Sequence, residues 1–108
     1  MKDCLIYIMP PKNALFFSKI QDLVDKSGEV FLDKNSDFDI KEAKKYPDGF
    51  LYFEYLLEIS INEKSDEILI INNVLNYLWD NHIPAIASCD FEDKLDKKGG
   101  YKDLSVSF

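Results

Sequence analysis

The sequence contains no arginine, and its 13 cationic residues are all lysines. Against them stand 20 acidic residues, so the 108-residue chain has a net charge of -7 at pH 7. Proteins that bind nucleic acid or anionic membranes present positive surfaces, and guanidinium groups form bidentate contacts to phosphate. The composition therefore argues against direct binding of nucleic acid or of a membrane, and it favours a basic protein as the partner.

Cysteine, histidine and long apolar runs are also scarce. The chain has two cysteines, Cys4 and Cys89, and one histidine, His82. A structural zinc site needs about four Cys or His ligands at close spacing, so we expect no zinc site, and we expect no other cofactor. The apolar run 5–9 is too short for the core of a signal peptide or for a membrane helix. We therefore expect a cytoplasmic protein with reduced thiols.

The periodicity of the apolar residues predicts one α+β domain that covers 1–108. Its expected elements, in the order βαββαβ, are a strand at 5–9, a helix at 14–27, and strands at 29–32 and 50–61, followed by a helix at 66–81 and a strand at 83–88. This order favours the two-layer ferredoxin-like arrangement, with a four-stranded antiparallel sheet and both helices on one face. The first and third strands are then central, and the last is an edge strand beside the first. Residues 94–108 are compatible either with an ordered segment or with a frayed C-terminal tail.

Both helices have recognisable ends. Asn13 and Ser65 are expected as N-caps, and Gly28 as the C-terminal stop of the first helix. In the second helix we expect one apolar stripe to face the core, and it consists of Ile68, Ile71, Leu75 and Leu78. The stripe is widened by Leu69, Val74 and Trp79.

The predicted topology makes a statement about the cysteines. Cys4 begins the first strand and Cys89 follows the last, and these two strands are expected to be adjacent and antiparallel. The two thiols should therefore lie close together without a bond between them. His82 precedes the last strand and should lie at the opposite end of the sheet.

The negative charge is concentrated in one part of the chain. Residues 50–93 hold one lysine against nine acids, a net of -8, whereas the rest of the chain has a net of +1. An acidic surface of this kind is often no more than a solvated surface that keeps a protein soluble. The alternative is an acidic interface that steers a basic partner.

The long predicted strand 50–61 supports that alternative. Its odd-numbered positions are all apolar, whereas its even-numbered positions mix acids, aromatics and aliphatics. In a two-layer fold the even-numbered face is left uncovered by helices, and Tyr52, Glu54 and Glu58 lie on it. An uncovered sheet face with both acids and aromatics is typical of a protein-binding surface.

A second acidic group follows the last predicted strand. Asp90, Glu92 and Asp93 could bind a divalent metal or act as acid and base. They could also form a plain charged turn, with Phe91 folded back onto the core. No histidine and no glycine-rich phosphate loop accompany them, so we expect binding or structure here rather than an enzyme.

Four segments resemble small bacterial immunity proteins of polymorphic toxin systems, including those of contact-dependent growth inhibition. They are Gly49-Phe50-Leu51-Tyr52-Phe53-Glu54-Tyr55, the helix end Leu78-Trp79, and Ala87-Ser88-Cys89-Asp90-Phe91-Glu92-Asp93 with Gly99-Gly100-Tyr101. The resemblance implies a non-enzymatic cytosolic antitoxin that binds a cognate toxin domain and blocks its active site. Many such toxins are nucleases with basic clefts, to which an acidic partner is complementary.

The resemblance assigns no contact residue, so the interface is predicted from the charge pattern alone. It consists of Tyr52, Glu54, Glu58, Asp90, Glu92 and Asp93. The long connection 33–49 is an alternative contact region. Two other functions remain open: a small-molecule-binding or regulatory ferredoxin-like domain, and a metal-dependent enzyme that uses the acids of 90–93.

Overall fold

The computed structural model describes residues 2–9, 15–34, 55–96 and 99. The main elements are β1 (Lys2–Ile8), α1 (Leu15–Val24), β2 (Gly28–Lys34), β3 (Tyr55–Ile61), α3 (Glu67–Asp80) and β4 (Ala85–Ser88). Two short 3₁₀ turns, η1 (Asp25–Ser27) and η3 (Glu92–Lys94), follow α1 and β4. Asn13 and most of the long connection between β2 and β3 lie outside the described residues.

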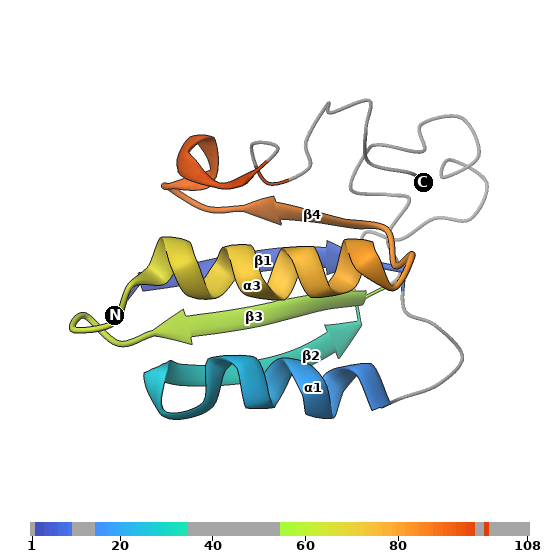
Figure 1. Cartoon of the computed structure of the whole chain (residues 1–108), viewed down its shortest axis with the longest axis horizontal. Helices are drawn as coiled ribbons and strands as arrows, with labels where there is room; N and C mark the ends of the chain where they lie inside the picture. The colour runs from blue at the N-terminus through green and yellow to red at the C-terminus, as the bar shows by residue number, and fades with distance from the viewer. Residues whose placement is uncertain (1, 10–14, 35–54, 97–98, 100–108) are drawn as a thin grey trace.

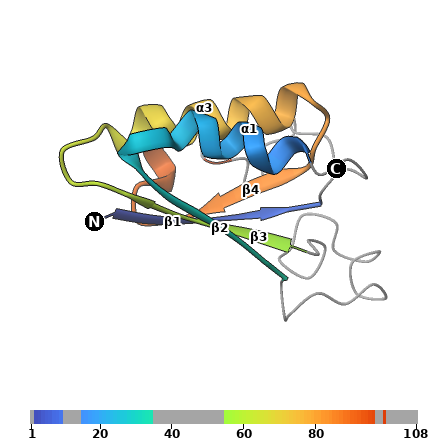
Figure 2. The same cartoon turned by 90° about the horizontal axis from the view of Figure 1, so that it is seen from below.

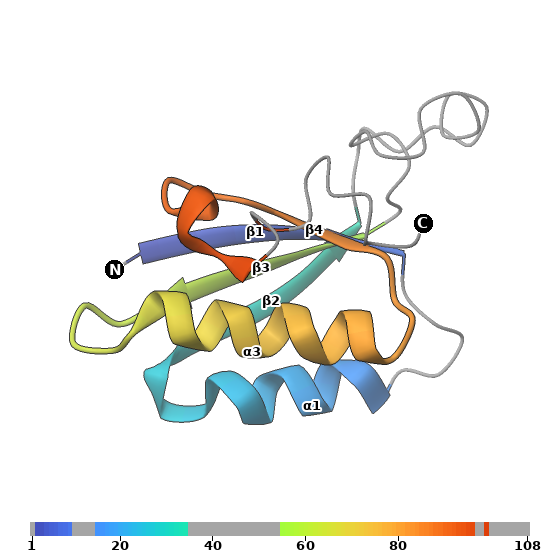
Figure 3. The same cartoon turned by 45° about the horizontal axis from the view of Figure 1, so that its top comes forward.

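The four strands form one antiparallel sheet in the order β2-β3-β1-β4 (Figure 1). The α+β class and the four-stranded antiparallel sheet are thus as predicted. So are the central positions of the first and third strands and the edge position of the last strand beside the first. Both α1 and α3 lie on the same side of the sheet (Figures 2 and 3).

The hydrophobic core lies between the sheet and the two helices. Strand residues alternate in burial along β1 and β3, so that Ile6 and Leu57 are fully buried while Leu5 and Glu58 keep part of their surface. Ile6 pairs with Leu57 on one side and with Ala87 on the other, which aligns three inward side chains across the sheet. Ile20 of α1 and Leu75 and Leu78 of α3 close the core from the helix layer.

The N-terminal end of α3 differs from the prediction. Asp66, not Ser65, is the N-cap, because its Oδ1 accepts a hydrogen bond from the backbone N–H of Leu69 at 3.1 Å. The core stripe differs from the prediction at two positions, while four of its predicted members are fully buried, namely Ile71, Val74, Leu75 and Leu78. Ile70 is buried, whereas Leu69 is 56% exposed, since the packing of α3 against the sheet and α1 decides which apolar side chains face inward.

The C-terminal end of α3 is closed by paired hydrogen bonds to its last turn. The N–H of His82 donates to the carbonyl of Trp79 at 3.0 Å, and the N–H of Ile83 donates to that of Leu78 at 2.9 Å. His82 has a φ of 59°, the left-handed conformation that such a cap requires. The only histidine of the chain thus has a structural position at a helix end.

Gly28 is not simply a helix stop. α1 ends at Val24, η1 intervenes, and Gly28 is the first residue of β2. A Cβ at this position would overlap the backbone carbonyl oxygen of Ser60 on β3. The glycine is therefore required by the close approach of two strands.

The prediction for the cysteines is confirmed. Sγ of Cys4 lies 3.1 Å from Sγ of Cys89, and the two thiols are not joined in a disulfide. His82 lies beyond the other end of β4, near the end of β1 where the N–H of Met9 donates to the carbonyl of Pro84 at 3.1 Å. The adjacency of β1 and β4 is the physical reason for both results.

Candidate functional site

The candidate site is the side of the sheet that faces away from the helices. Pairing and alternation assign to it one row, Phe31, Glu58, Leu5 and Ser88, that crosses all four strands. We call the whole set the acidic face; its members are Asp3, Leu5 and Tyr7 of β1, Glu29, Phe31 and Asp33 of β2, Leu56, Glu58 and Ser60 of β3, and Ile86 and Ser88 of β4.

Every charged residue that the described strands place on this face is an acid. Asp3, Glu29, Asp33 and Glu58 lie on it, whereas Lys2 and Lys34 occupy positions of the opposite, helix-side register. Nζ of Lys2 is bound there to Oε1 of Glu67 on α3, at 2.7 Å. The strands thus sort their charges by sign, and the side without helices receives only the negative ones.

The acidic face becomes more accessible from β4 towards β2. Ile86 on β4 is fully buried, and the residues on β1 and β3 are mostly half-buried. Phe31 on β2 is 50% exposed, and its neighbours Glu29 and Asp33 are exposed too. A partner can therefore reach the face most readily at β2 and the adjoining part of β3.

Phe31 stands among carboxylates at this accessible end. Glu58 is its cross-strand partner, and Glu29 and Asp33 lie two residues to either side on the same face of β2. Phe31 and Glu58 also line a shallow hollow of about 760 Å³ beside β2, together with Asp33 and with Phe17 of α1. The ring is thus an exposed apolar group with negative charge on three sides.

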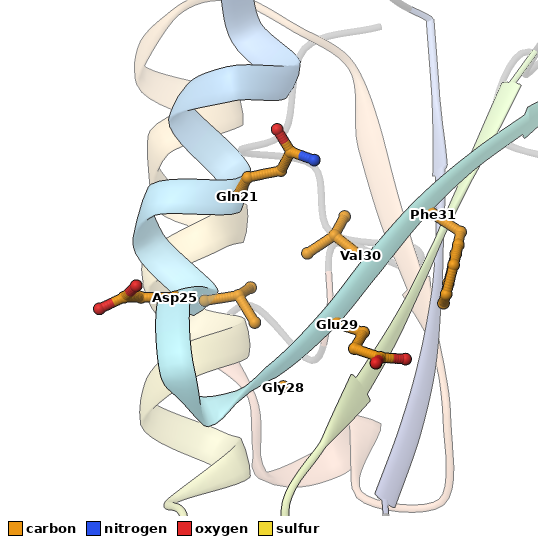
Figure 4. A pocket seen from close by; sticks show the side chains of 7 residues that line it. Gln21, Asp25, Gly28, Glu29, Val30 and Phe31 are labelled. Atoms are coloured by element: carbon orange, nitrogen blue, oxygen red, sulfur yellow. The ribbon is translucent and has the colours of Figure 1, made fainter.

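A second, smaller hollow continues along the same strand towards its start. It has a volume of about 380 Å³ and lies between α1 and β2 (Figure 4). Val30 points towards α1, whereas Glu29 and Phe31 point to the other side of the strand. Phe31 lines both hollows, so the strand presents this ring as the centre of its accessible surface.

This arrangement suits a cationic side chain. An ammonium or guanidinium group over an aromatic ring is attracted by the ring face, and nearby carboxylates add direct ion pairs. In the part of the chain that the structure describes, no three His, Cys, Asp or Glu side chains gather in a way that could hold a metal ion. The geometry of the acidic face therefore favours recognition of a basic surface.

The structure places the predicted site residues in three groups. Tyr52 and Glu54 lie outside the described residues. Glu58 lies in the middle of the acidic face. Asp90 follows β4 and lines a hollow of about 500 Å³ at one end of the sheet, together with Asp3 of the acidic face and with Lys2 and Lys94.

The rest of the second acidic group belongs to the helix layer. Phe91 and Leu95 are buried in the core on either side of η3, which confirms the alternative in which Phe91 folds inward. Asp96 holds this segment to α3, because its Oδ2 accepts from Nδ2 of Asn76 at 3.0 Å and its N–H donates to Oδ1 of Asn72 at 2.8 Å. Glu92 and Asp93 lie in η3, which is on the helix side of the sheet (Figure 2). The fold does not bring Asp93 together with Glu58.

Four residues of the site were missed by the sequence analysis. Glu29, Phe31 and Asp33 alternate with Val30 and Leu32, and this short pattern could have indicated an acidic strand face. Asp3 had no such signal, because its place on the face depends on the pairing of β1 with β3.

Comparison of the chain with protein-family profiles, with curated proteins and with solved structures gives no match. Among the described residues, no helix combines the length and the apolar character needed to cross a membrane. The geometry and charge of the acidic face are therefore the features of this protein that point to a function.

Proposed function

We propose that this protein is an immunity protein that binds a cognate bacterial toxin domain and neutralises it by covering its basic active site. The observation that carries the proposal is the acidic face, to which the described strands contribute four carboxylates and no cation. Three of these carboxylates, those of Glu29, Asp33 and Glu58, surround an exposed Phe31. A toxin that cleaves nucleic acid needs a basic cleft for phosphate, and this face is complementary to such a cleft. We propose a nuclease as the toxin, and no catalytic activity for this chain.

The charges and the ring have different tasks in this interaction. The carboxylates accelerate the encounter with a basic domain and set its orientation, an effect that salt screens. Phe31 supplies an apolar anchor, and aromatic anchors that become buried at the centre of an interface contribute most of its affinity. Glu29, Asp33 and Glu58 then bind Lys or Arg side chains around that anchor.

The contact surface proposed here extends the interface expected from sequence. Glu58 and Asp90 belong to both, and Phe31, Glu29 and Asp33 are added. Tyr52, Glu54, Glu92 and Asp93 stay predictions. We also propose a cytoplasmic location and a ferredoxin-like class for the fold, which is supported by the order of the elements and by the two helices on one side of the sheet.

The test is co-purification of the full chain with the product of the adjacent gene, followed by titration calorimetry at low and high salt. Neutralising Glu29→Gln and Asp33→Asn together should weaken binding at low salt by roughly tenfold and flatten its salt dependence. A matched control, Asp22→Asn with Asp80→Asn, removes the same charge from the exposed surface of α1 and α3 and should change the affinity less than about twofold.

Phe31→Ala tests the anchor. It should lower the affinity by roughly 30-fold, the effect of losing an interface hot spot, with its salt dependence unchanged. Equal affinities for the wild type, the acid variant and Phe31→Ala would place the interface elsewhere. Failure of the neighbouring gene product to bind the wild-type chain would remove the antitoxin proposal itself.

A further inference from the structure

The thiols of Cys4 and Cys89 form a pair outside the acidic face. Sγ of Cys4 lies 3.1 Å from Sγ of Cys89, and these are the only cysteines in the chain. Leu5 pairs with Ser88 in the β1–β4 ladder, so the next facing positions along this register are those of the two cysteines. Facing residues of antiparallel strands have Cα atoms about 4.5–5.5 Å apart, which falls within the range that a disulfide spans. A bond between them needs a small approach of the sulfur atoms and no rearrangement of the strands.

The two thiols differ in their access to solvent. Cys4 is 1% exposed, whereas Cys89 keeps part of its surface and lines the hollow of about 500 Å³. The other lining residues of that hollow are Lys2, Asp3, Asp90, Phe91 and Lys94. They carry charge of both signs, so access and the neighbouring thiol, more than the local charge, favour reaction at Cys89. A small oxidant can reach Cys89 first and leave Cys4 as the second thiol.

We propose that Cys4 and Cys89 are a reversible oxidation site that takes up peroxide and closes to an intramolecular disulfide. The thiolate of Cys89 attacks one oxygen of hydrogen peroxide; the O–O bond breaks, a sulfenic acid forms on Cys89, and the departing hydroxide takes the thiol proton as water. The sulfur of Cys4 then attacks the sulfur of Cys89, the S–O bond breaks, and the proton of Cys4 leaves with that oxygen as a second water. Two thiols are oxidised and one peroxide is reduced to two waters.

Oxidation at this site acts on an edge of the sheet. β4 is a four-residue edge strand that pairs with β1 alone among the described strands, and the turn that carries Asp90 follows it directly. A disulfide from Cys4 to Cys89 ties the end of β4 to the central strand. Backbone amides of β4 should therefore exchange with solvent more slowly in the oxidised protein than in the reduced protein. This inference does not depend on the proposed binding function.

The test is exposure of the reduced full-length chain to hydrogen peroxide, followed by intact mass measurement and maleimide labelling under denaturing conditions. The expected product is a monomer lighter by about 2 Da in which neither cysteine is labelled, and dithiothreitol should restore both labels. A chain whose mass and labelling stay unchanged would overturn the proposal. A disulfide-linked dimer, or a Cys89 oxidised to sulfinic acid beside a labelled Cys4, would also overturn it.

Two matched variants separate the roles of the thiols. Cys4→Ser lacks the second thiol, so its Cys89 should accumulate as a sulfenic acid that dimedone traps. Cys89→Ser keeps only the buried thiol and should react with peroxide at least about tenfold more slowly than Cys4→Ser. Equal rates in the two variants would contradict the assignment of Cys89 as the attacking thiol. The wild-type measurement remains decisive if either variant fails to fold.

Discussion

The two sides of this sheet are made by the same strands but have opposite properties. On the helix side, β1 and β3 present fully buried aliphatic residues such as Ile6, Leu57 and Ile59. On the other side the same strands present Leu5, Glu58 and Asp3, which keep contact with solvent. A period of two residues thus lets one strand contribute to stability with one set of side chains and to recognition with the other.

The comparison explains why Phe31 matters. An aromatic side chain contributes most to folding when it is buried, and the helix side of β2 has Val30 and Leu32 instead. Phe31 is 50% exposed among acids on the other side, where it adds little to the core. Leu15 and Leu69 on the helices are more exposed than Phe31, so exposure alone does not single out the ring. Its position among three carboxylates does, and under the proposed function a basic partner covers it.

The largest expected change in stability comes from truncating one side chain on each side of β1 in turn. Ile6→Ala removes a fully buried side chain and should lower the free energy of unfolding by about 2–5 kcal/mol. Leu5→Ala is the matched change on the acidic face, where the side chain is half-buried, and should cost roughly 1 kcal/mol. Urea denaturation measures both. Equal losses would mean that the two sides of β1 are equally packed.

A somewhat smaller loss of stability is expected from a substitution at the first residue of β2, which lies on the helix side of the sheet. Gly28→Ala puts a methyl group against the carbonyl oxygen of Ser60, so β2 and β3 must separate locally, at a cost of about 1–3 kcal/mol. Ser27→Ala, one residue earlier, is the control and should change stability by less than about 0.5 kcal/mol. Thermal unfolding compares the two variants; an unchanged midpoint for Gly28→Ala would contradict the close strand contact.

A weaker, pH-dependent effect is expected at the helix-side ion pair. The hydrogen bond to the Lys2 ammonium, and then the hydrogen bond to its own backbone N–H, hold the pKa of Glu67 below its ordinary value of 4.5. The same hydrogen bond and the charge of Glu67 raise the pKa of Lys2 above 10.5. The pair therefore stabilises the fold above the ordinary pKa of Glu67, and this contribution fades as the pH falls through the lowered value or rises through the raised one.

The variant Glu67→Gln tests the predicted direction of this pH dependence. At low salt the variant should be slightly less stable than the wild type at neutral pH, and the difference should shrink at acidic pH, as the carboxylate of the wild type takes up a proton below its lowered pKa. Urea titrations at the two pH values measure the difference. A difference of the same size at both would show that the charge of Glu67 is not responsible.

The smallest effect on stability is expected on the acidic face itself. Glu29→Gln with Asp33→Asn should change the free energy of unfolding by less than about 0.5 kcal/mol, because both side chains are exposed. The same variant is expected to bind the toxin domain more weakly. Calorimetric unfolding, measured beside the binding titration, tests whether the two acids contribute to binding without contributing to stability. A loss of several kcal/mol in the free energy of unfolding would show that they stabilise the fold.

Much of the fold could be predicted from local patterns. The order of strands and helices, the central and edge strands, and the contact between Cys4 and Cys89 all followed from periodicity and general topology rules. The predicted N-cap of α3 was wrong, and its predicted inward face was right except at two positions. Asp66 is the cap and Ile70 is buried instead of Leu69, because side-chain hydrogen bonding and packing select among neighbours with similar propensities.

The candidate site was predicted only in part. Glu58 was expected on an uncovered sheet face, since its strand alternates clearly. Phe31 was missed, because the strand predicted at 29–32 is short and its place beside Glu58 depends on the register of pairing with β3. Asp93, predicted for the same interface as Glu58, belongs to a segment that is hydrogen-bonded to α3 through Asp96.

The sequence by itself determined the sign of the surface and the alternation of each strand, because net charge and a two-residue period are properties of consecutive residues. Only the tertiary structure decided that Glu29, Phe31, Glu58 and Asp3 share one face. Those neighbours come from three different strands. Their meeting depends on strand register and on the core that holds the strands together, and neither is encoded in any single segment.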